Sequence, residues 1–125
     1  MSEVTAKGSC LCGGVCYQVT GPVQDVTACH CTQCRKQSGH FWASSWAAEE
    51  DFELLSKEGL TWYRASDIAV RGFCATCGSA LFWKKNDADR ISFSAGSLDE
   101  HPGVTLTKHI FTEDKGDYYA LEPKE

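Results

Sequence analysis

Eight cysteines constrain this chain more than any other feature, and seven of them fall into three short groups. The groups are Cys10 and Cys12, then Cys29, Cys31 and Cys34, then Cys74 and Cys77. Cysteines this close in sequence can direct their thiolates at one metal ion. Residues 1–7 lack the apolar core of a secretory signal. We therefore expect a cytoplasmic protein, in which thiols stay reduced and grouped cysteines bind metal instead of forming disulfides.

The first and third groups together supply four cysteines, which is the number that closes a tetrahedral zinc site. We expect Cys10, Cys12, Cys74 and Cys77 to form one structural site that joins segments about sixty residues apart. Four thiolates form a soft tetrahedral set that favours zinc, and the spacings do not match ferredoxin-type iron–sulfur runs. Structural zinc contributes roughly 10–16 kcal/mol of apparent binding free energy in small domains, which offsets the entropy of closing so long a loop.

The middle group supplies three cysteines, so a zinc ion held by Cys29, Cys31 and Cys34 would keep one position open, as catalytic zinc does. Zinc holds a thiol as its thiolate, and a thiolate is a nucleophile toward a carbonyl. An open site therefore predicts reversible addition of a thiol to a small aldehyde. The alternative is a closed and purely structural site. Its fourth ligand would be Cys16, His40, His101 or His109.

The charge balance argues against nucleic acid as a partner. The formal net charge is −5, from 12 basic and 17 acidic side chains, and thiolate–zinc centres would make it more negative. The chain therefore has no overall attraction to a phosphate backbone. No apolar run reaches the ~18 residues of a membrane span, so we expect no membrane partner. The oligomeric state stays open.

Alternation of apolar residues predicts a mainly β chain of 125 residues, about one domain, without sustained helical periodicity. Val15, Tyr17 and Val19 alternate with polar neighbours, as in a half-buried strand. Near the end, Tyr118 and Tyr119 are expected to fold back onto the body. One helical turn is predicted over 32–37, and further strands over 26–30, 41–47, 52–55, 60–64, 68–73, 80–84, 91–95 and 108–111.

Several side chains beside the cysteine groups have two interpretations. His30 lies between two cysteines, and in extended backbone its side chain would point away from both, which favours a supporting or surface histidine over a ligand. Arg35 and Lys36 follow the middle group, where they could offset thiolate charge or form a solvated turn. Alternate residues of the 41–47 strand are expected to pack in the core, with a pocket wall as the alternative. They are Trp42, Ser44 and Trp46.

Taken in order, the cysteine groups and their flanking residues resemble one known family. The residues are Gly8-Ser9-Cys10-Leu11-Cys12-Gly13-Gly14, Cys29-His30-Cys31 with Cys34, Phe73-Cys74 with Cys77-Gly78-Ser79, Gly96-Ser97-Leu98-Asp99, and His109-Ile110-Phe111 with Asp114-Lys115. They resemble the glutathione-dependent formaldehyde-activating enzyme family, which also includes the domain of centromere protein V. The resemblance predicts one zinc-binding domain over residues 8–119, with short tails at 1–7 and 120–125.

The resemblance implies a mainly β, Mss4-like fold, in which sheets meet in a tent-like arrangement. It also implies the same division of zinc sites, with the four-cysteine set structural and Cys29, Cys31 and Cys34 at the active site. The family's named activity is a carbon–sulfur lyase reaction run in reverse, the condensation of formaldehyde with glutathione to S-hydroxymethylglutathione. Candidates to bind glutathione by charge are Arg35, Lys36 and Arg71, and candidates to move a proton are His30, His109 and Asp99.

The leading hypothesis from the sequence is a zinc-dependent carbon–sulfur lyase of the S-hydroxymethylglutathione synthase type. Its partners would be a small-molecule thiol, such as glutathione, and a small aldehyde. Two noncatalytic alternatives remain, a thiol-binding carrier and a zinc-stapled protein-interaction module. Turnover distinguishes the enzyme from both, and a fourth protein ligand on the second metal would favour the interaction module.

Overall fold

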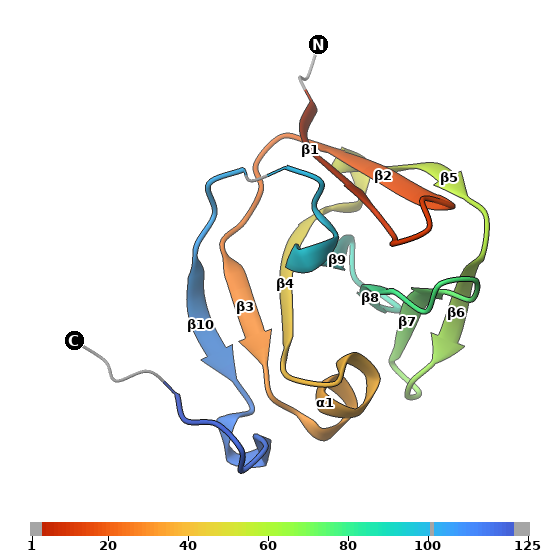
Figure 1. The fold of residues 1–125 in the computed structure, drawn as a ribbon. Coiled ribbons are helices and arrows are strands. Elements are labelled where there is room, and N and C mark those ends of the chain that lie inside the picture. Colours follow the sequence, from red (N-terminus) through yellow and green to blue (C-terminus); the bar gives the residue numbers. More distant parts are fainter. Residues whose placement is uncertain (1–3, 101, 122–125) are drawn as a thin grey trace.

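The computed structural model describes residues 4–100 and 102–121, whose strands form two sheets (Figure 1). A three-stranded sheet has the order β1-β2-β5, and a seven-stranded sheet has the order β10-β3-β4-β9-β8-β7-β6. The strands are β1 Val4–Ser9, β2 Val15–Thr20, β3 Val26–Cys29, β4 Trp42–Ala48, β5 Phe52–Lys57, β6 Leu60–Arg64, β7 Ala69–Cys74, β8 Ala80–Lys85, β9 Arg90–Ser94 and β10 Leu106–Ile110. This arrangement confirms the mainly β, single-domain prediction.

The core lies between the two sheets and is built around Tyr17 of β2. Val15, Tyr17 and Val19 are fully buried, as their alternation predicted. The Tyr17 ring lies 5.3 Å from the rings of Phe52 and Phe82 and 5.4 Å from that of Phe93, measured between centroids. Its hydroxyl hydrogen-bonds Ser97 Oγ at 2.6 Å. One aromatic residue of the small sheet therefore joins strands of both sheets.

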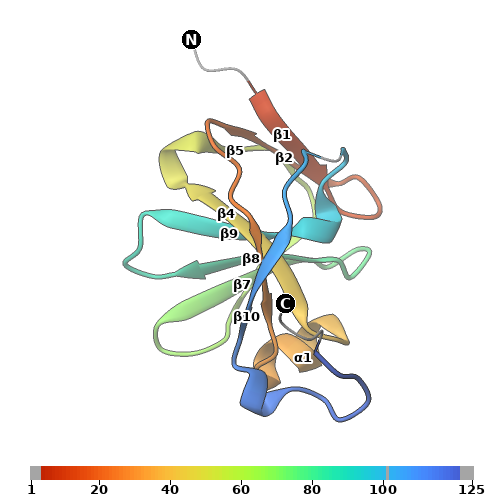
Figure 2. The same cartoon turned by 90° about the vertical axis from the view of Figure 1, so that its left-hand side faces the viewer.

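One short helix, α1 Thr32–Ser38, connects β3 to β4. Cys31 caps its N-terminus by accepting a hydrogen bond from the Cys34 backbone N–H, at 3.3 Å. The helix ends at Gly39, whose φ of 89° is the left-handed conformation that favours glycine. Figures 1 and 2 show α1 and the segment after β10 at the same end of the large sheet. Nowhere in residues 4–100 and 102–121 is there a helix with the length and apolarity to cross a bilayer.

The C-terminal segment folds back onto the body, as predicted. Tyr119 and His30 are hydrogen-bonded through the tyrosine hydroxyl and His30 Nδ1. Tyr118 makes the same kind of contact with His40 Nδ1, at 2.8 Å. Within that segment, the Lys115 ammonium donates to the Tyr119 carbonyl and lies 4.8 Å from the centre of its ring. These contacts hold the end of the described chain against the β3–α1–β4 region.

Two sequence-based expectations differ from the structure, one of them only in part. Residues 4–7, expected in an N-terminal tail, belong to β1, which pairs antiparallel with β2. They are mostly exposed and show no burial alternation, so their pattern carried no strand signal. In β4, Trp42 is buried as predicted, but Ser44 and Trp46 are only half-buried, and Ser45 and Ala47 are buried in their place. Trp46 instead makes a cation–π contact outside the core. The Arg90 guanidinium carbon lies 4.5 Å from the centre of the Trp46 ring.

Gly8 leaves the space that Tyr17 occupies, and this contact gives a stability prediction. A Cβ built at residue 8 would lie 2.2 Å from Tyr17 Cζ, whereas a Cβ at Gly96 would meet nothing within 4 Å. Neither glycine has a positive φ, so the substitution to alanine adds no backbone strain at either site. Gly8→Ala should therefore lower the free energy of unfolding by about 1–3 kcal/mol, as overpacking does.

Urea unfolding of Gly8→Ala beside its control Gly96→Ala measures this difference. Gly96→Ala should stay within about 0.5 kcal/mol of the parent protein, as an uncrowded surface change does. Equal stability of the two variants would show that Tyr17 can move aside, and would contradict the close packing described here.

Candidate metal centres

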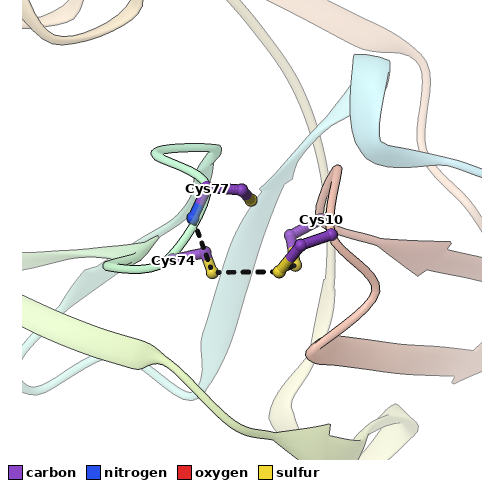
Figure 3. Close-up of side chains that lie close together, drawn as sticks. Cys10, Cys74 and Cys77 are labelled. Carbon is purple, nitrogen blue, oxygen red and sulfur yellow. Dashed lines mark hydrogen bonds between the residues drawn. The ribbon is translucent and has the colours of Figure 1, made fainter.

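The first and third cysteine groups meet in the structure. Cys10 and Cys12 lie in the β1–β2 loop, Cys74 ends β7, and Cys77 lies in the β7–β8 loop. The four sulfur atoms lie within 4.8 Å of one another. Figure 3 shows the side chains of Cys10, Cys74 and Cys77 converging from these two loops. Four thiols at this spacing can hold one tetrahedral metal ion, and the donor set is compatible with zinc.

Neutral donors surround this four-cysteine group. The Val15 N–H donates to Cys10 Sγ at 3.3 Å, and the Cys77 N–H donates to Cys74 Sγ at 3.5 Å. The Ser79 hydroxyl contacts Cys77 Sγ at 3.3 Å, and this contact lowers the pKa of Cys77 to about 5. Hydrogen bonds of this kind favour the thiolate form that a metal needs. The signal in the sequence was the serine two positions after the C-x-x-C pair.

The turn that carries Cys74 and Cys77 depends on one glycine from the neighbouring hairpin. A Cβ at Gly59 would lie 3.1 Å from Cys74 Sγ, and Gly59 also has a φ of 87°. Its carbonyl accepts a hydrogen bond from the Ala75 N–H at 2.8 Å. The β5–β6 turn therefore packs directly under the four-cysteine group, where a side chain would crowd the sulfur.

The middle group is also gathered into one cluster. Cys29 is the last residue of β3, Cys31 is the N-cap of α1, and Cys34 lies in its first turn, where it is buried. The three sulfur atoms lie within 4.8 Å of one another. Across residues 4–100 and 102–121, no fourth cysteine, histidine or carboxylate joins them at that spacing. This geometry fits a metal ion that has three protein ligands and one further coordination position open to another ligand.

The alternative fourth ligands named from the sequence lie elsewhere. Cys16 belongs to β2, and its thiol donates to the Gly13 carbonyl at 3.2 Å, on the side of the four-cysteine group. His40 pairs with Tyr118, and His109 contacts His30 through its Nδ1 at 2.9 Å. His101 lies outside the described residues. None of the three described alternatives belongs to the three-cysteine group.

His30 lies between two cysteines in the sequence, but it belongs to neither candidate metal-binding group and it is not a surface residue. Its side chain is 1% exposed and packs against Phe41, with a distance of 5.1 Å between ring centres. Its two ring nitrogens contact Tyr119 and His109. Burial lowers its pKa, so the ring is neutral over a wider pH range. His30 therefore supports the cysteine loop by anchoring it to the C-terminal segment.

Arg71 of β7 is the one charged side chain in contact with the three-cysteine group among the described hydrogen bonds. Its guanidinium is 4% exposed and donates through Nη2 to Cys34 Sγ at 3.4 Å. Nη1 donates to Gln37 at 3.1 Å, and Nε donates to Gln33 at 3.4 Å. The contacts from Cys29 and then from Arg71 lower the pKa of Cys34 to about 6. The sequence had indicated Arg71 only as a cation that could bind glutathione.

A cleft of about 610 Å³ borders the four-cysteine group and α1, and none of Cys29, Cys31 and Cys34 lines it. Cys10 borders it on one side, and Gln37 and Ser38 of α1 border it on the other. Trp42, the cross-strand partner of Cys29, lines its wall. Trp42 is 6% exposed, and its indole N–H has no hydrogen-bond partner among the described residues. Pockets of this size accept small organic molecules.

The candidates for binding glutathione and moving a proton are separated in space. Asp99 lines the cleft, where its Oδ1 accepts a hydrogen bond from Ser9 at 2.5 Å. His30 and His109 do not line it, and they contact each other through His30 Nε2 and His109 Nδ1. Arg35 is half-buried and Lys36 is exposed on α1, so neither charge is committed to an ion pair among the described residues.

The chain is similar to named proteins over nearly its whole length. It is 25% identical over 123 residues to an uncharacterised lyase of Schizosaccharomyces pombe, which covers 94% of this chain and 86% of the relative. It is 27% identical over 129 residues to a protein of Halomonas elongata named "Putative glutathione-dependent formaldehyde-activating enzyme", covering 95% and 82%. A crystal structure of a Rhodobacter sphaeroides protein shares the fold, with a TM-score of 0.65 and 24% identity over 82% of this chain and 98% of that one.

A sequence profile of one family covers most of the chain, from residue 5 to residue 114. The match begins within β1, upstream of the boundary expected from the sequence, and it includes both cysteine clusters. It ends after β10, before the tyrosines that contact His30 and His40. The chain belongs to the glutathione-dependent formaldehyde-activating enzyme family.

Proposed function

We propose that this protein is a zinc-dependent enzyme of the carbon–sulfur lyase type, which interconverts glutathione, or a similar thiol, and formaldehyde, or a similar aldehyde, with their adduct. Family membership and the names of its relatives support a lyase-type enzyme of glutathione-linked aldehyde chemistry. The observation that carries the finer proposal is the cluster of Cys29, Cys31 and Cys34, which gathers three thiols without a fourth protein ligand among the described residues.

The two cysteine groups are assigned different tasks. Cys10, Cys12, Cys74 and Cys77 would hold a structural zinc ion, because four ligands close its coordination sphere. Cys29, Cys31 and Cys34 would hold a second zinc ion with one open position. A zinc ion bound there would supply Lewis acidity, lowering the pKa of an incoming thiol so that it binds as the thiolate. The residues present fit both tasks by ligand type and number.

The reaction is an addition that needs no oxidant or reductant. The thiol sulfur forms a bond to the carbonyl carbon, the carbonyl π electrons move to oxygen, and the proton from sulfur ends on that oxygen. In the reverse direction the carbon–sulfur bond breaks and the proton returns. Holding both reactants in one site converts a bimolecular encounter into an oriented reaction, which is the main contribution that a cleft can make.

The cleft beside Trp42 is the proposed binding site for the thiol substrate. It touches the α1 residues that follow Cys34, and the strand that pairs with Cys29. Trp42, on the strand that pairs with Cys29, supplies an aromatic surface to the wall of this cleft. Asp99 is the one proton-transfer candidate that lines this cleft, so we assign the proton transfer to its carboxylate.

The first prediction concerns turnover. Exchange NMR of glutathione, formaldehyde and their adduct at equilibrium should show faster interconversion with the protein than in buffer alone. Cys31→Ser should abolish the increase, because it removes a ligand of the three-cysteine group, while the fold persists through the four-cysteine group. The matched control is Cys16→Ser, which changes a thiol outside both groups and should keep the full rate.

Two outcomes of that measurement would contradict the enzyme. An exchange rate equal to that of the spontaneous reaction, with saturable glutathione binding, would favour a noncatalytic thiol carrier. No acceleration and no glutathione binding would favour a protein-interaction module.

The metal content of the same variants gives a second prediction. We expect two zinc ions per parent chain, one per Cys31→Ser chain, and two per Cys16→Ser chain, measured by elemental analysis after gel filtration. Cys77→Ser should lose the folded state, because the four-cysteine site supplies a large part of the stability of a small domain. A well-folded Cys77→Ser protein would remove the structural role of the first site.

Asp99 gives a third prediction. Asp99→Asn keeps the shape of the side chain and its contact with Ser9 but removes the proton acceptor. The enzyme-dependent exchange rate should fall by roughly 10²–10⁴-fold, the usual contribution of general acid–base catalysis, while glutathione affinity changes little. The control is Asp67→Asn, which makes the same change at an exposed carboxylate beyond β6. An unchanged rate would exclude Asp99 from proton transfer.

A further inference from the structure

The buried charge of Arg71 lacks the partner that such a charge ordinarily has. Its side chain is 4% exposed, and the ion pairs of the described residues do not include it. Two of its contacts go to the amide oxygens of Gln33 and Gln37, which are neutral. Buried charges are stable only when they are paired or coordinated, and arginine keeps its proton at any physiological pH. The compensating negative charge must therefore come from another group.

The sulfur of Cys34 is the remaining acceptor. Arg71 Nη2 lies 3.4 Å from Cys34 Sγ, and this contact is buried. Cys34 is itself 3% exposed and belongs to the three-cysteine group. Three thiolates around a zinc ion carry one net negative charge in total. That charge is equal and opposite to the charge of the guanidinium.

We propose that Arg71 is the positioning residue of the three-cysteine centre: its charge neutralises the centre and so allows an anionic thiolate to take the fourth position. This inference rests on the proposed function, which assigns that position to the thiol substrate. Without Arg71, an incoming thiolate would approach a centre that is already negative. With Arg71 present, the incoming thiolate approaches a centre whose charge is neutralised. The affinity of the centre for a thiolate, relative to neutral ligands, is therefore higher.

The four-cysteine group provides an internal comparison. Its sulfur atoms receive hydrogen bonds from the backbone of Val15 and Cys77 and a contact from the Ser79 hydroxyl, all of which are neutral. No arginine or lysine contacts these sulfurs among the described hydrogen bonds. A closed site has no further anion to admit, so it has no use for a buried cation. The charge lies only where an additional thiolate is expected.

Arg71 also fixes α1 relative to the large sheet, so charge and docking have to be separated by experiment. Gln33 and Gln37 lie one helical turn apart on α1, and both accept hydrogen bonds from the same guanidinium. Gln33 further donates to the Ala65 carbonyl at 3.2 Å. Gln33→Ala removes both contacts of Gln33 and so weakens the docking of the helix, but it leaves the arginine charge beside Cys34 and does not change the cleft wall. Arg71→Gln removes the charge and retains a polar side chain.

The test uses the full chain loaded with cobalt(II), whose absorption reports the number of thiolate ligands at such sites. Glutathione is titrated into the parent protein, Arg71→Gln, Arg71→Lys, Gln33→Ala and Arg64→Gln. Arg64 lies on the adjacent strand and is exposed, so its variant makes the same chemical change without contact to the cysteines. Near-ultraviolet circular dichroism of each variant checks that α1 and the core are retained.

For Arg71→Gln we expect cobalt affinity at the three-cysteine centre to fall by roughly 10–100-fold, as it does when a residue that orients a metal ligand is lost. Glutathione affinity should fall by about tenfold or more, the usual effect of losing a hydrogen bond to a charged group. Arg71→Lys should recover part of both affinities. Gln33→Ala and Arg64→Gln should bind cobalt and glutathione as the parent does, since neither side chain lines the cleft.

The outcomes separate this inference from the proposed function. If Arg71→Gln binds cobalt and glutathione like the parent, or if Gln33→Ala shows the same loss as Arg71→Gln, then the charge of Arg71 has no special role and the inference is wrong. If the parent's cobalt spectrum does not change with glutathione, the open thiol site of the proposed function is wrong, whatever Arg71 does to metal affinity.

Discussion

The convergence of four cysteines from two distant loops is the constraint on which the rest of the structure depends. It brings the β1–β2 loop of the small sheet against the β7–β8 loop of the large sheet. Those loops approach because Tyr17 and the phenylalanines behind it fill the space between the sheets. A chain of 125 residues buries only part of the surface that its unfolded form exposes, which limits the stability that its core provides. A metal ion that closes this junction would add to that stability.

The three-cysteine group uses the same ligand chemistry for a different purpose. It lies at the end of β3 and the start of α1, where Cys31 caps the helix and Cys34 points at Arg71. Its neighbours are a buried cation on one side and, through His30, the returning C-terminal segment on the other. The cleft that borders α1 and Trp42 also borders Cys10 of the four-cysteine group. A closed centre and an open centre on one small scaffold would thus divide stability from chemistry.

Much of the fold could be predicted because β-strands with one buried face show alternating apolar and polar residues in the sequence. Val15, Tyr17 and Val19 show this, and the grouping of the cysteines followed from spacing alone. The strand of residues 4–9 escaped prediction, since an exposed strand has no alternation to detect. The burial of Arg71 and His30 also escaped it, because each depends on contacts with residues more than thirty positions away. Tertiary contacts of this kind leave no local pattern in a single sequence.

The proposed chemistry requires that one of the two candidate metal centres keeps a coordination position for a thiol. X-ray absorption at the zinc edge, with and without glutathione, tests it most directly by counting sulfur ligands per metal. With four cysteines in one group and three in the other, the average should be about 3.5 sulfurs per zinc and should rise toward four when glutathione is added. Four sulfurs on every zinc without glutathione, or a count that glutathione leaves unchanged, would contradict it.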